Sequence, residues 1–524
     1  MKNALLLIFV YVLASPFTLA QNRSNEVDIL WGEEVRASKR STLTDIVGYN
    51  ESGICVLKEE YSRIRLSSVS TLEHYDNEMM LSGSLELGDI EFIIHLQDEL
   101  YVFTSELDKK SKLNILYSQS VDMGEMQLNN DKQEIAEVYF SGFSRFNSGS
   151  FAYEVSGDSS KLFINYNLPY NKNESEKFGF HVFDSSLNEV WHREVTLPYT
   201  DQLFSVEDYV VDNNGGVHLV GVEYKDKRAA KRRGEPNYTY HILSFNGGRD
   251  SDTPVQVEGK FITDMQIAID KDLNVLCGGF YSALGTFSIE GSFFLKLNSS
   301  SNEVVSESYK AFGIDFITQH MSKRNEKKAK KKDKKGKDVE MYQYDLDNII
   351  LKEDGGVMII GEQYFVRTVT STSTDANGAT RTTTNYYYYY NDIIVISVAP
   401  NGDIDWTQKI PKIQITSNDG GFFSSYALSV VADKLYFVFN DNPKNLFYTG
   451  KGRIYNFNRG KESLVVLVTL DSDGVQKREA LFSAREADIL TRPKVCEQIS
   501  GTEMIIFGQR KKSHRLGKIE FVGN

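Results

Sequence analysis

Short runs of apolar residues recur along the chain, and each follows a polar turn. The two clearest copies read Asn-Gly-Gly-Val-His-Leu-Val-Gly at 214–221 and Asp-Gly-Gly-Val-Met-Ile-Ile-Gly at 354–361. With weaker copies there are eight such runs, which begin near residues 54, 100, 162, 217, 274, 357, 435 and 504. A short apolar run between turn signals is typical of a β-strand that is buried on both faces. The pattern therefore predicts an all-β repeat protein that is almost free of helix.

The three tryptophans share a second recurring context. Trp31, Trp191 and Trp406 each stand four residues before a Val or an Ile, and the last two follow turn-like stretches. We interpret these segments as the last strand of a repeat, in which the indole covers the gap to the neighbouring repeat. Three unrelated core tryptophans are the alternative.

The two ends of the chain complement each other. Trp31 precedes the first complete repeat, whereas the last repeat, residues 491–521, is short. A strand at 28–35 would complete the last repeat by pairing near 515–522, and such closure removes exposed sheet edges. The spacing of 46 to 83 residues between successive runs fits four-stranded units with variable loops.

In these repeats the chain resembles secreted bacterial β-propeller proteins, over essentially all of residues 28–522. The resemblance is architectural, because neither recurring motif belongs to one activity. It implies an all-β fold, a β-propeller of eight blades closed by pairing of the N- and C-terminal strands. Seven blades or two smaller propellers are the alternatives.

The first twenty residues have the pattern of a secretory signal peptide. Lys2 precedes the apolar run 4–14, and Thr-Leu-Ala at 18–20 suits a cleavage site. Eleven apolar residues fall short of the ~20 that span a bilayer, and no later run approaches that length. We expect residues 21–524 to form a single exported domain without a transmembrane segment, either secreted, periplasmic or at the cell surface.

Charge is distributed unevenly. The formal net charge is −13, yet residues 323–337 carry ten basic and two acidic side chains, which leaves −21 on the rest. An acidic body with one basic segment argues against nucleic-acid binding. We expect an insertion at about 313–343 that forms a Lys-rich solvated loop. Its lysines could contact an anionic partner, and the candidate residues are Lys328, Lys331, Lys332 and Lys335.

A second insertion, at about 364–395, is rich in Thr and Tyr. Asn377-Gly378 favours a two-residue turn, so the segment predicts a long two-stranded hairpin. Successive side chains of a strand point to opposite faces, which divides five consecutive tyrosines between the two faces. These candidate binding residues for a glycan or a protein are Tyr386, Tyr387, Tyr388, Tyr389 and Tyr390. Packing against a neighbouring loop is the alternative.

Linear motifs for chemistry are missing from the sequence. The His residues lack metal-site spacing, and there is no nucleophile elbow or phosphate-binding loop, so we expect no metal site and no cofactor. Cys55, Cys277 and Cys496 lie in apolar runs and are expected to be buried free thiols. We therefore favour a non-catalytic binding or scaffolding protein. A glycan-acting hydrolase or lyase with its site at the channel is the alternative, because a propeller can assemble such a site without any linear motif.

Overall fold

The computed structural model describes most of the chain. The described residues are 24–36, 41–62, 67–129, 131–140, 149–169, 173–229, 231–232, 234–285, 288–298, 301, 303–374, 379–450, 452–458, 462–510 and 512–522. The expected signal peptide, residues 1–20, and the Asn377-Gly378 turn lie outside them.

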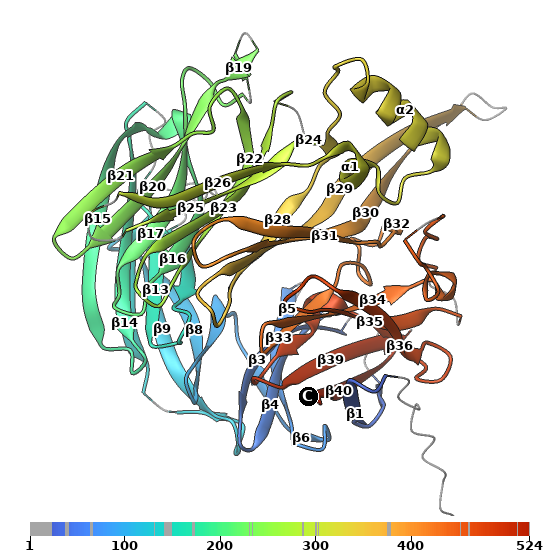
Figure 1. The fold of residues 1–524 in the computed structure, drawn as a ribbon. Helices are drawn as coiled ribbons and strands as arrows, with labels where there is room; N and C mark the ends of the chain where they lie inside the picture. Colours follow the sequence, from blue (N-terminus) through green and yellow to red (C-terminus); the bar gives the residue numbers. More distant parts are fainter. Residues whose placement is uncertain are drawn as a thin grey trace, which may run out of the picture.

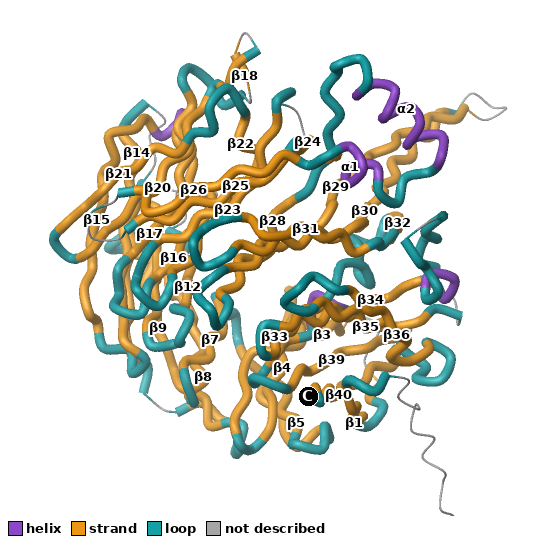
Figure 2. The backbone as a smooth tube through the Cα atoms, viewed as in Figure 1, coloured by secondary structure: helices purple, strands orange, loops and turns teal. Residues whose placement is uncertain are grey.

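Within these residues the chain is nearly all β, as Figure 2 shows, and it forms eight antiparallel sheets of four or more strands. The first four sheets follow one another along the chain. The first contains β3 (Ser41–Asn50), β4 (Gly53–Ser62), β5 (Ser67–Tyr75) and β6 (Leu81–Leu87). The second contains β7 (Phe92–Leu96), β8 (Glu99–Asp108), β9 (Leu113–Asp122), β10 (Gln127–Leu128) and β11 (Gln133–Tyr139). The third contains β12 (Phe151–Val155), β13 (Lys161–Asn167), β14 (Ser175–Asp184) and β15 (Glu189–Thr200). The fourth contains β16 (Phe204–Val211), β17 (Val217–Tyr224), β20 (Tyr238–Asn246) and β21 (Arg249–Val255).

The other four sheets repeat this order. The fifth contains β22 (Phe261–Ile269), β23 (Val275–Ser282), β25 (Gly291–Leu297) and β26 (Val304–Ala311). The sixth contains β28 (Asp345–Leu351), β29 (Val357–Thr374), β30 (Thr380–Val398), β31 (Ile404–Ile410) and β32 (Gln414–Ser417). The seventh contains β33 (Ala427–Val431), β34 (Lys434–Asp441), β35 (Leu464–Leu470) and β36 (Gln476–Ser483). The eighth contains β37 (Leu490–Thr491), β38 (Glu497–Gln498), β39 (Glu503–Arg510), β40 (Ser513–Phe521), β1 (Val27–Trp31) and β2 (Val35–Arg36).

Short elements fill the connections between these strands. Two further strand pairs are β18 (Lys231–Arg232) with β19 (Glu235–Pro236), and β24 (Ser288–Ile289) with β27 (Met341–Tyr342). The helices are α1 (Ile314–Thr318) and α2 (Lys323–Asp333), and the short 3₁₀ turns are η1 (Asp201–Leu203), η2 (Pro443–Asn445) and η3 (Pro493–Val495). No helix in the described part of the chain is long and apolar enough to cross a membrane.

Each of the eight apolar runs found in the sequence is the second strand of its sheet. Both faces of these strands are buried because apolar clusters fill the space between successive sheets. One further cluster joins the last sheet to the first, where Ile505 and Phe507 pack with Ile54 and Val56. In Figure 1 the red C-terminal strands accordingly lie beside the blue N-terminal ones.

The expected pairing of the two chain ends is present. Strand β1 runs antiparallel to β40, with Val27 opposite Phe521 and Trp31 opposite Gly517. All three tryptophans lie on the last strand of a sheet, as the sequence predicts. Two of them reach the following sheet, since the indole of Trp191 donates a hydrogen bond to the Gly215 carbonyl at 2.8 Å and that of Trp406 to Ser472 at 2.9 Å.

The Lys-rich segment differs from the expected loop, because residues 323–333 form helix α2. Ser322 caps its N-terminus by accepting a hydrogen bond from the Asn325 backbone N–H at 3.4 Å. Lys, Arg and Ala are favourable helix residues, and lysines near the C-terminus interact well with the helix dipole. A run too polar to build a core can therefore still form a solvated helix.

Candidate functional site

The insertions gather at one end of the strands. The β29–β30 hairpin joins the second and third strands of its sheet, and α2 lies between the last strand of one sheet and the first strand of the next. In an antiparallel up-and-down sheet these two kinds of connection share an end. Figure 1 shows the hairpin and α2 projecting together from that end, which we call the insertion face.

The predicted hairpin is present and is long. Strands β29 and β30 pair from Val357 opposite Val398 out to Thr374 opposite Thr380. Threonine hydroxyls face each other across its outer half, with Thr370–Thr384 at 3.2 Å and two further pairs at 3.3 and 3.4 Å. Cross-strand Thr pairs and β-branched residues keep such a ribbon extended. The hairpin is therefore an ordered, solvent-exposed projection.

The five tyrosines stand at the base of this hairpin, between β29 and β32. Tyr386 is 46% exposed, whereas Tyr390 is buried. The Tyr389 ring stacks on Phe365 at 4.3 Å, and Tyr342 meets the same Phe365 edge-on at 5.1 Å. The tyrosines therefore serve different purposes, since the inner ones pack while the outer ones reach solvent.

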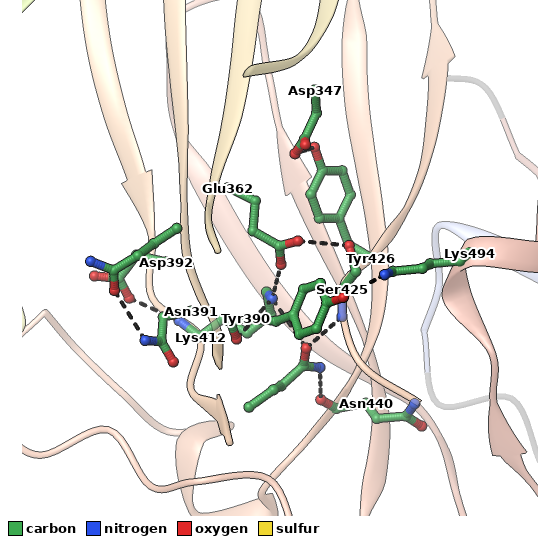
Figure 3. A network of polar contacts seen from close by, with 12 residues as sticks. Asp347, Glu362, Tyr390, Asn391, Asp392, Lys412, Ser425, Tyr426, Asn440 and Lys494 are labelled. Carbon is green, nitrogen blue, oxygen red and sulfur yellow. Dashed lines mark hydrogen bonds and ion pairs between the residues drawn. The ribbon is translucent and has the colours of Figure 1, made fainter. Parts of the chain in front are cut away.

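A buried polar network holds the hairpin base against the next two sheets (Figure 3). The Lys412 side chain is fully buried and its ammonium forms an ion pair with Glu362 of β29. The same ammonium donates to the Gln414 side-chain oxygen at 3.1 Å and to the Tyr390 carbonyl at 3.3 Å. Ser425 donates its hydroxyl to the other Glu362 oxygen at 2.7 Å. Every donor of the ammonium thus has an acceptor.

The network continues into the seventh and eighth sheets. The Gln414 amide donates to the Asn440 carbonyl at 2.8 Å, and the Asn440 amide donates in turn to the Thr491 carbonyl. Lys494 donates to the Tyr390 hydroxyl at 2.6 Å and lies 4.3 Å from the centre of that ring. Burial lowers the pKa of Lys494. Because these buried groups are occupied by one another, we interpret the network as a structural brace rather than a reactive centre.

The carboxyl group of Asp347, beside the brace, has a raised pKa. Burial, followed by the charge of Glu362, raises the pKa of Asp347 to about 7. Its oxygen accepts a hydrogen bond from the Tyr426 hydroxyl at 2.6 Å. Asp347 also lines a surface cavity together with Lys494 and Glu497.

The lysines expected to contact an anionic partner all lie on the surface. Lys328, Lys331 and Lys332 are exposed on α2, and Lys335 is exposed just after it. Lys330 of α2 forms an ion pair with Asp315 of α1 at 2.8 Å and one with Glu326 of its own helix at 3.0 Å. The structure therefore brings the candidate lysines and tyrosines to the same face of the molecule.

A polar cavity of about 720 Å³ opens between the third and fourth sheets. Burial, and then the neighbouring Asp201 carboxyl, raises the pKa of Glu176 to about 8. Two neighbouring carboxyl groups repel each other when both are ionised, which favours the protonated form of one of them. Tyr209 also lines the cavity, and Arg228 shapes its wall by donating to the backbone carbonyls of Gln202 at 3.0 Å and Asp201 at 2.8 Å. No linear motif marks this pair of carboxyl groups.

The cysteines agree with the sequence analysis except that Cys496 is only partly buried. None of the three forms a disulfide, and Cys55 and Cys277 are buried. Burial raises the pKa of the Cys55 and Cys496 thiols to about 12, which makes both unreactive at neutral pH.

The sequence analysis expected no metal site and missed one cluster of possible metal ligands. His181, Glu189 and His192 meet at the far end of the third sheet, where their ligand atoms all lie within 4.8 Å of one another. The signal that could have found them is the hairpin register, which places His181 directly opposite His192.

Comparisons with known proteins identify similar folds only. No protein-family model matches the chain, and no curated protein matches its sequence. Among solved structures, a polysaccharide lyase is 9% identical with a TM-score of 0.37, and the match covers 94% of this chain and 99% of the lyase. The β-propeller domain of the Trilobed protease from Pyrococcus furiosus is 11% identical, with a TM-score of 0.35 and coverage of 84% and 97%. The WD40 domain of SCAP from fission yeast is 8% identical, with a TM-score of 0.26 and coverage of 82% and 93%. Likeness at this level assigns no activity.

Proposed function

We propose that the protein is an exported binding or scaffolding β-propeller of the cell envelope or exterior. Its eight sheets are eight blades of one ring, which β1 closes by completing the eighth blade. The eight apolar clusters support this arrangement, because they link every sheet to the next and the last to the first. Pairing of β1 with β40 covers the edge that β40 would otherwise expose in the last sheet.

The binding surface that we propose is the base of the β29–β30 hairpin. The observation that carries this proposal is the combination of a rigid support and exposed aromatic side chains. The Lys412–Glu362 brace is buried at the base of the hairpin, while Tyr386 remains 46% exposed on the ribbon. Tyrosine offers a flat apolar face with a polar tip, which suits the faces of sugar rings and the centres of protein interfaces.

The ligand class that we propose is a glycan or a protein, with anionic character. The lysines of α2 project from the same face, so an acidic ligand seated on the hairpin base would experience their field. Such long-range attraction is screened by salt over about 10 Å at 0.1 M ionic strength. Binding is therefore expected to weaken as salt is added.

The test compares tyrosine variants of the mature chain, residues 21–524. Binding is measured against a panel of defined polysaccharides, anionic and neutral, and against envelope extracts. We expect Y386S/Y388S to abolish binding with the melting temperature unchanged, because Tyr386 is half exposed. Y389S should instead lower the melting temperature, because it removes the stack on Phe365. Tyr309 on β26 is a matched control, since it is 44% exposed on another sheet.

Two results would count against this proposal. If Y386S/Y388S binds every ligand as the unaltered chain does, the hairpin base is not the binding surface. If Y309S weakens binding as much as Y386S/Y388S, the effect is not specific to the hairpin. Export is tested separately, by N-terminal sequencing of the protein recovered from the extracellular and periplasmic fractions, where cleavage after Ala20 is expected.

A second candidate function is a glycan-acting lyase or hydrolase, and the Glu176 cavity favours it. A catalytic base works best when its pKa lies near the working pH, which a pKa of about 8 satisfies. The raised pKa suits a group that accepts or donates a proton, which is the role that this function would give to Glu176. Depolymerisation of a polysaccharide that is abolished by E176Q, and unaffected by Y386S/Y388S, would establish this function instead.

A further inference from the structure

Two histidines and a glutamate meet at the outer rim of the third sheet. His181 lies on β14 and His192 on β15, and the strand register places them directly opposite each other. Glu189 begins β15, next to a register shift between Val182 and Phe183. The cluster lies at the β14–β15 turn, which is the end of the strands opposite the insertion face. It is therefore separate from the proposed binding surface.

The three side chains already converge on one point. The Nδ1 atom of His181 lies 2.7 Å from one Glu189 oxygen, and the Nδ1 atom of His192 lies 2.8 Å from the other. The imidazole rings are 5.3 Å apart between centroids. Metal bonds of about 2.0–2.2 Å separate neighbouring ligand atoms by roughly 3 to 3.5 Å. The ligand atoms all lie within 4.8 Å of one another, so binding an ion would draw the most distant pair together by at most roughly 1 to 2 Å.

The hairpin that carries these residues is rigid. The Asp184 carboxylate accepts hydrogen bonds from the backbone N–H groups of Ser186 at 3.0 Å and Asn188 at 2.9 Å. Leu187 adopts a φ of +59° at the turn and buries its side chain in the core between the second and third sheets. The His181 ring also stacks on Phe183 at 5.8 Å. A site whose ligands are fixed in advance loses little entropy when it binds an ion.

We propose that His181, Glu189 and His192 form a binding site for a divalent first-row transition-metal ion, with Zn²⁺ as the ion that fits best. Two imidazole nitrogens and one carboxylate oxygen form a ligand set typical of zinc and unlike the all-oxygen sets of Ca²⁺ and Mg²⁺. Three protein ligands leave a fourth tetrahedral position for water or for a ligand from outside. The ion would also join β14 to β15, the outermost strand of the sheet.

The test is titration of the metal-stripped mature chain with ZnCl₂ in an isothermal calorimeter. One ion is expected to bind per chain and to raise the melting temperature, whereas MgCl₂ should do neither. Removing a group that only hydrogen-bonds to a metal ligand costs about 10- to 100-fold in metal affinity. Removing a ligand itself should therefore weaken zinc binding at least about 100-fold. H192A and E189Q are therefore each expected to weaken zinc binding by that factor. His192 is 63% exposed, so H192A should fold normally, which circular dichroism can verify.

The control is E194Q, which removes a negative charge from the exposed side of the same strand and leaves the three ligands in place. Its zinc affinity should equal that of the unaltered chain. The proposal is overturned if the unaltered chain binds no zinc, or if H192A and E189Q bind it as tightly as the unaltered chain. An equal loss of affinity in E194Q and H192A would also overturn it, because general attraction to acidic residues would then explain the binding.

Discussion

Removing the Lys412 ammonium should destabilise the protein strongly, because its partner cannot be left buried alone. The Glu362 side chain is only 4% exposed, and its carboxylate accepts hydrogen bonds from the Lys412 ammonium and from the Ser425 hydroxyl. In K412M the carboxylate loses its counter-ion, and Gln414 loses a donor to its side-chain oxygen. Breaking a buried ion pair in this way costs about 3–5 kcal/mol. We expect the free energy of unfolding of K412M to fall by that amount.

The double variant K412M/E362Q sharpens the prediction. The side-chain amide at position 362 is neutral, and its oxygen can still accept the hydrogen bond from the Ser425 hydroxyl. Its N–H groups can replace the lost ammonium as donors to the Gln414 side-chain oxygen. Because the uncompensated charge is gone, the double variant should recover about 2 kcal/mol relative to K412M. A matched surface pair, Lys132 with Glu106, has the same kind of contact at 2.7 Å but is half exposed. K132M should therefore cost less than about 1 kcal/mol.

Urea unfolding measures these differences, followed by tryptophan fluorescence and circular dichroism so that coincident transitions justify a two-state treatment. The reasoning fails if K412M costs no more than K132M. It also fails if the double variant loses as much stability as the sum of its two single variants, since the two side chains would then act independently.

Three further predictions concern other parts of the molecule. Deleting residues 21–36 should lower the free energy of unfolding by about 3 kcal/mol or more, because the deletion removes the buried side chains of Val27 and Trp31. An unchanged melting temperature would show that the β1–β40 pairing adds no stability. Replacing residues 323–337 by a Gly/Ser linker should change the melting temperature little, because the lysines there are exposed and their ion pairs lie at the surface; a large drop would mean that α2 packs as core. The pKa of Glu176 is about 8 in the folded chain and 4.5 ordinarily, so the folded chain binds this proton more firmly than the unfolded chain does. The Glu176 carboxyl therefore lowers the free energy of unfolding increasingly as the pH rises from about 4.5 to about 8. E176Q should thus gain stability over the unaltered chain at about pH 8.5 and gain nothing at about pH 3.5, below both pKa values. An equal difference in urea midpoint at both pH values would contradict the raised pKa.

The sequence predicts the second strand of every sheet because that strand is apolar on both faces. Residues 217–222 are all buried, as are residues 357–362, so an unbroken apolar run marks their position. The outermost strands lack this signal, since only one of their faces is covered, and tryptophan marks three of them by its size. The long hairpin was predictable from its alternating Thr and Val residues. Helix α2 was not, because its stability comes from capping and from residues that also favour solvation.

The candidate site was predictable only in part. The tyrosine run could be recognised as a surface feature, but the sequence does not distinguish the buried Tyr390 from the exposed Tyr386. That difference depends on Lys494, which reaches Tyr390 from a sheet more than a hundred residues later in the chain. The buried polar network and the His181 cluster likewise depend on the folded arrangement of their residues. Their members come together through sheet packing and strand register, which no linear spacing encodes.

A further repeated feature lies in the innermost strands, where an aspartate follows a β-bulge. Register shifts occur just before Asp45, Asp208 and Asp264 in three different sheets. A bulge frees a backbone N–H group that needs an acceptor. Asp264 accepts the N–H of Leu346 in the next sheet at 2.7 Å, and Asp208 accepts that of Ile267 in the sheet that follows its own. Burial raises the pKa of all three carboxyl groups, that of Asp264 to about 6. Asp264 and Asp208 thus each link their own sheet to the next one by a polar contact. Apolar periodicity misses this link because it depends on one side chain and one extra residue per strand.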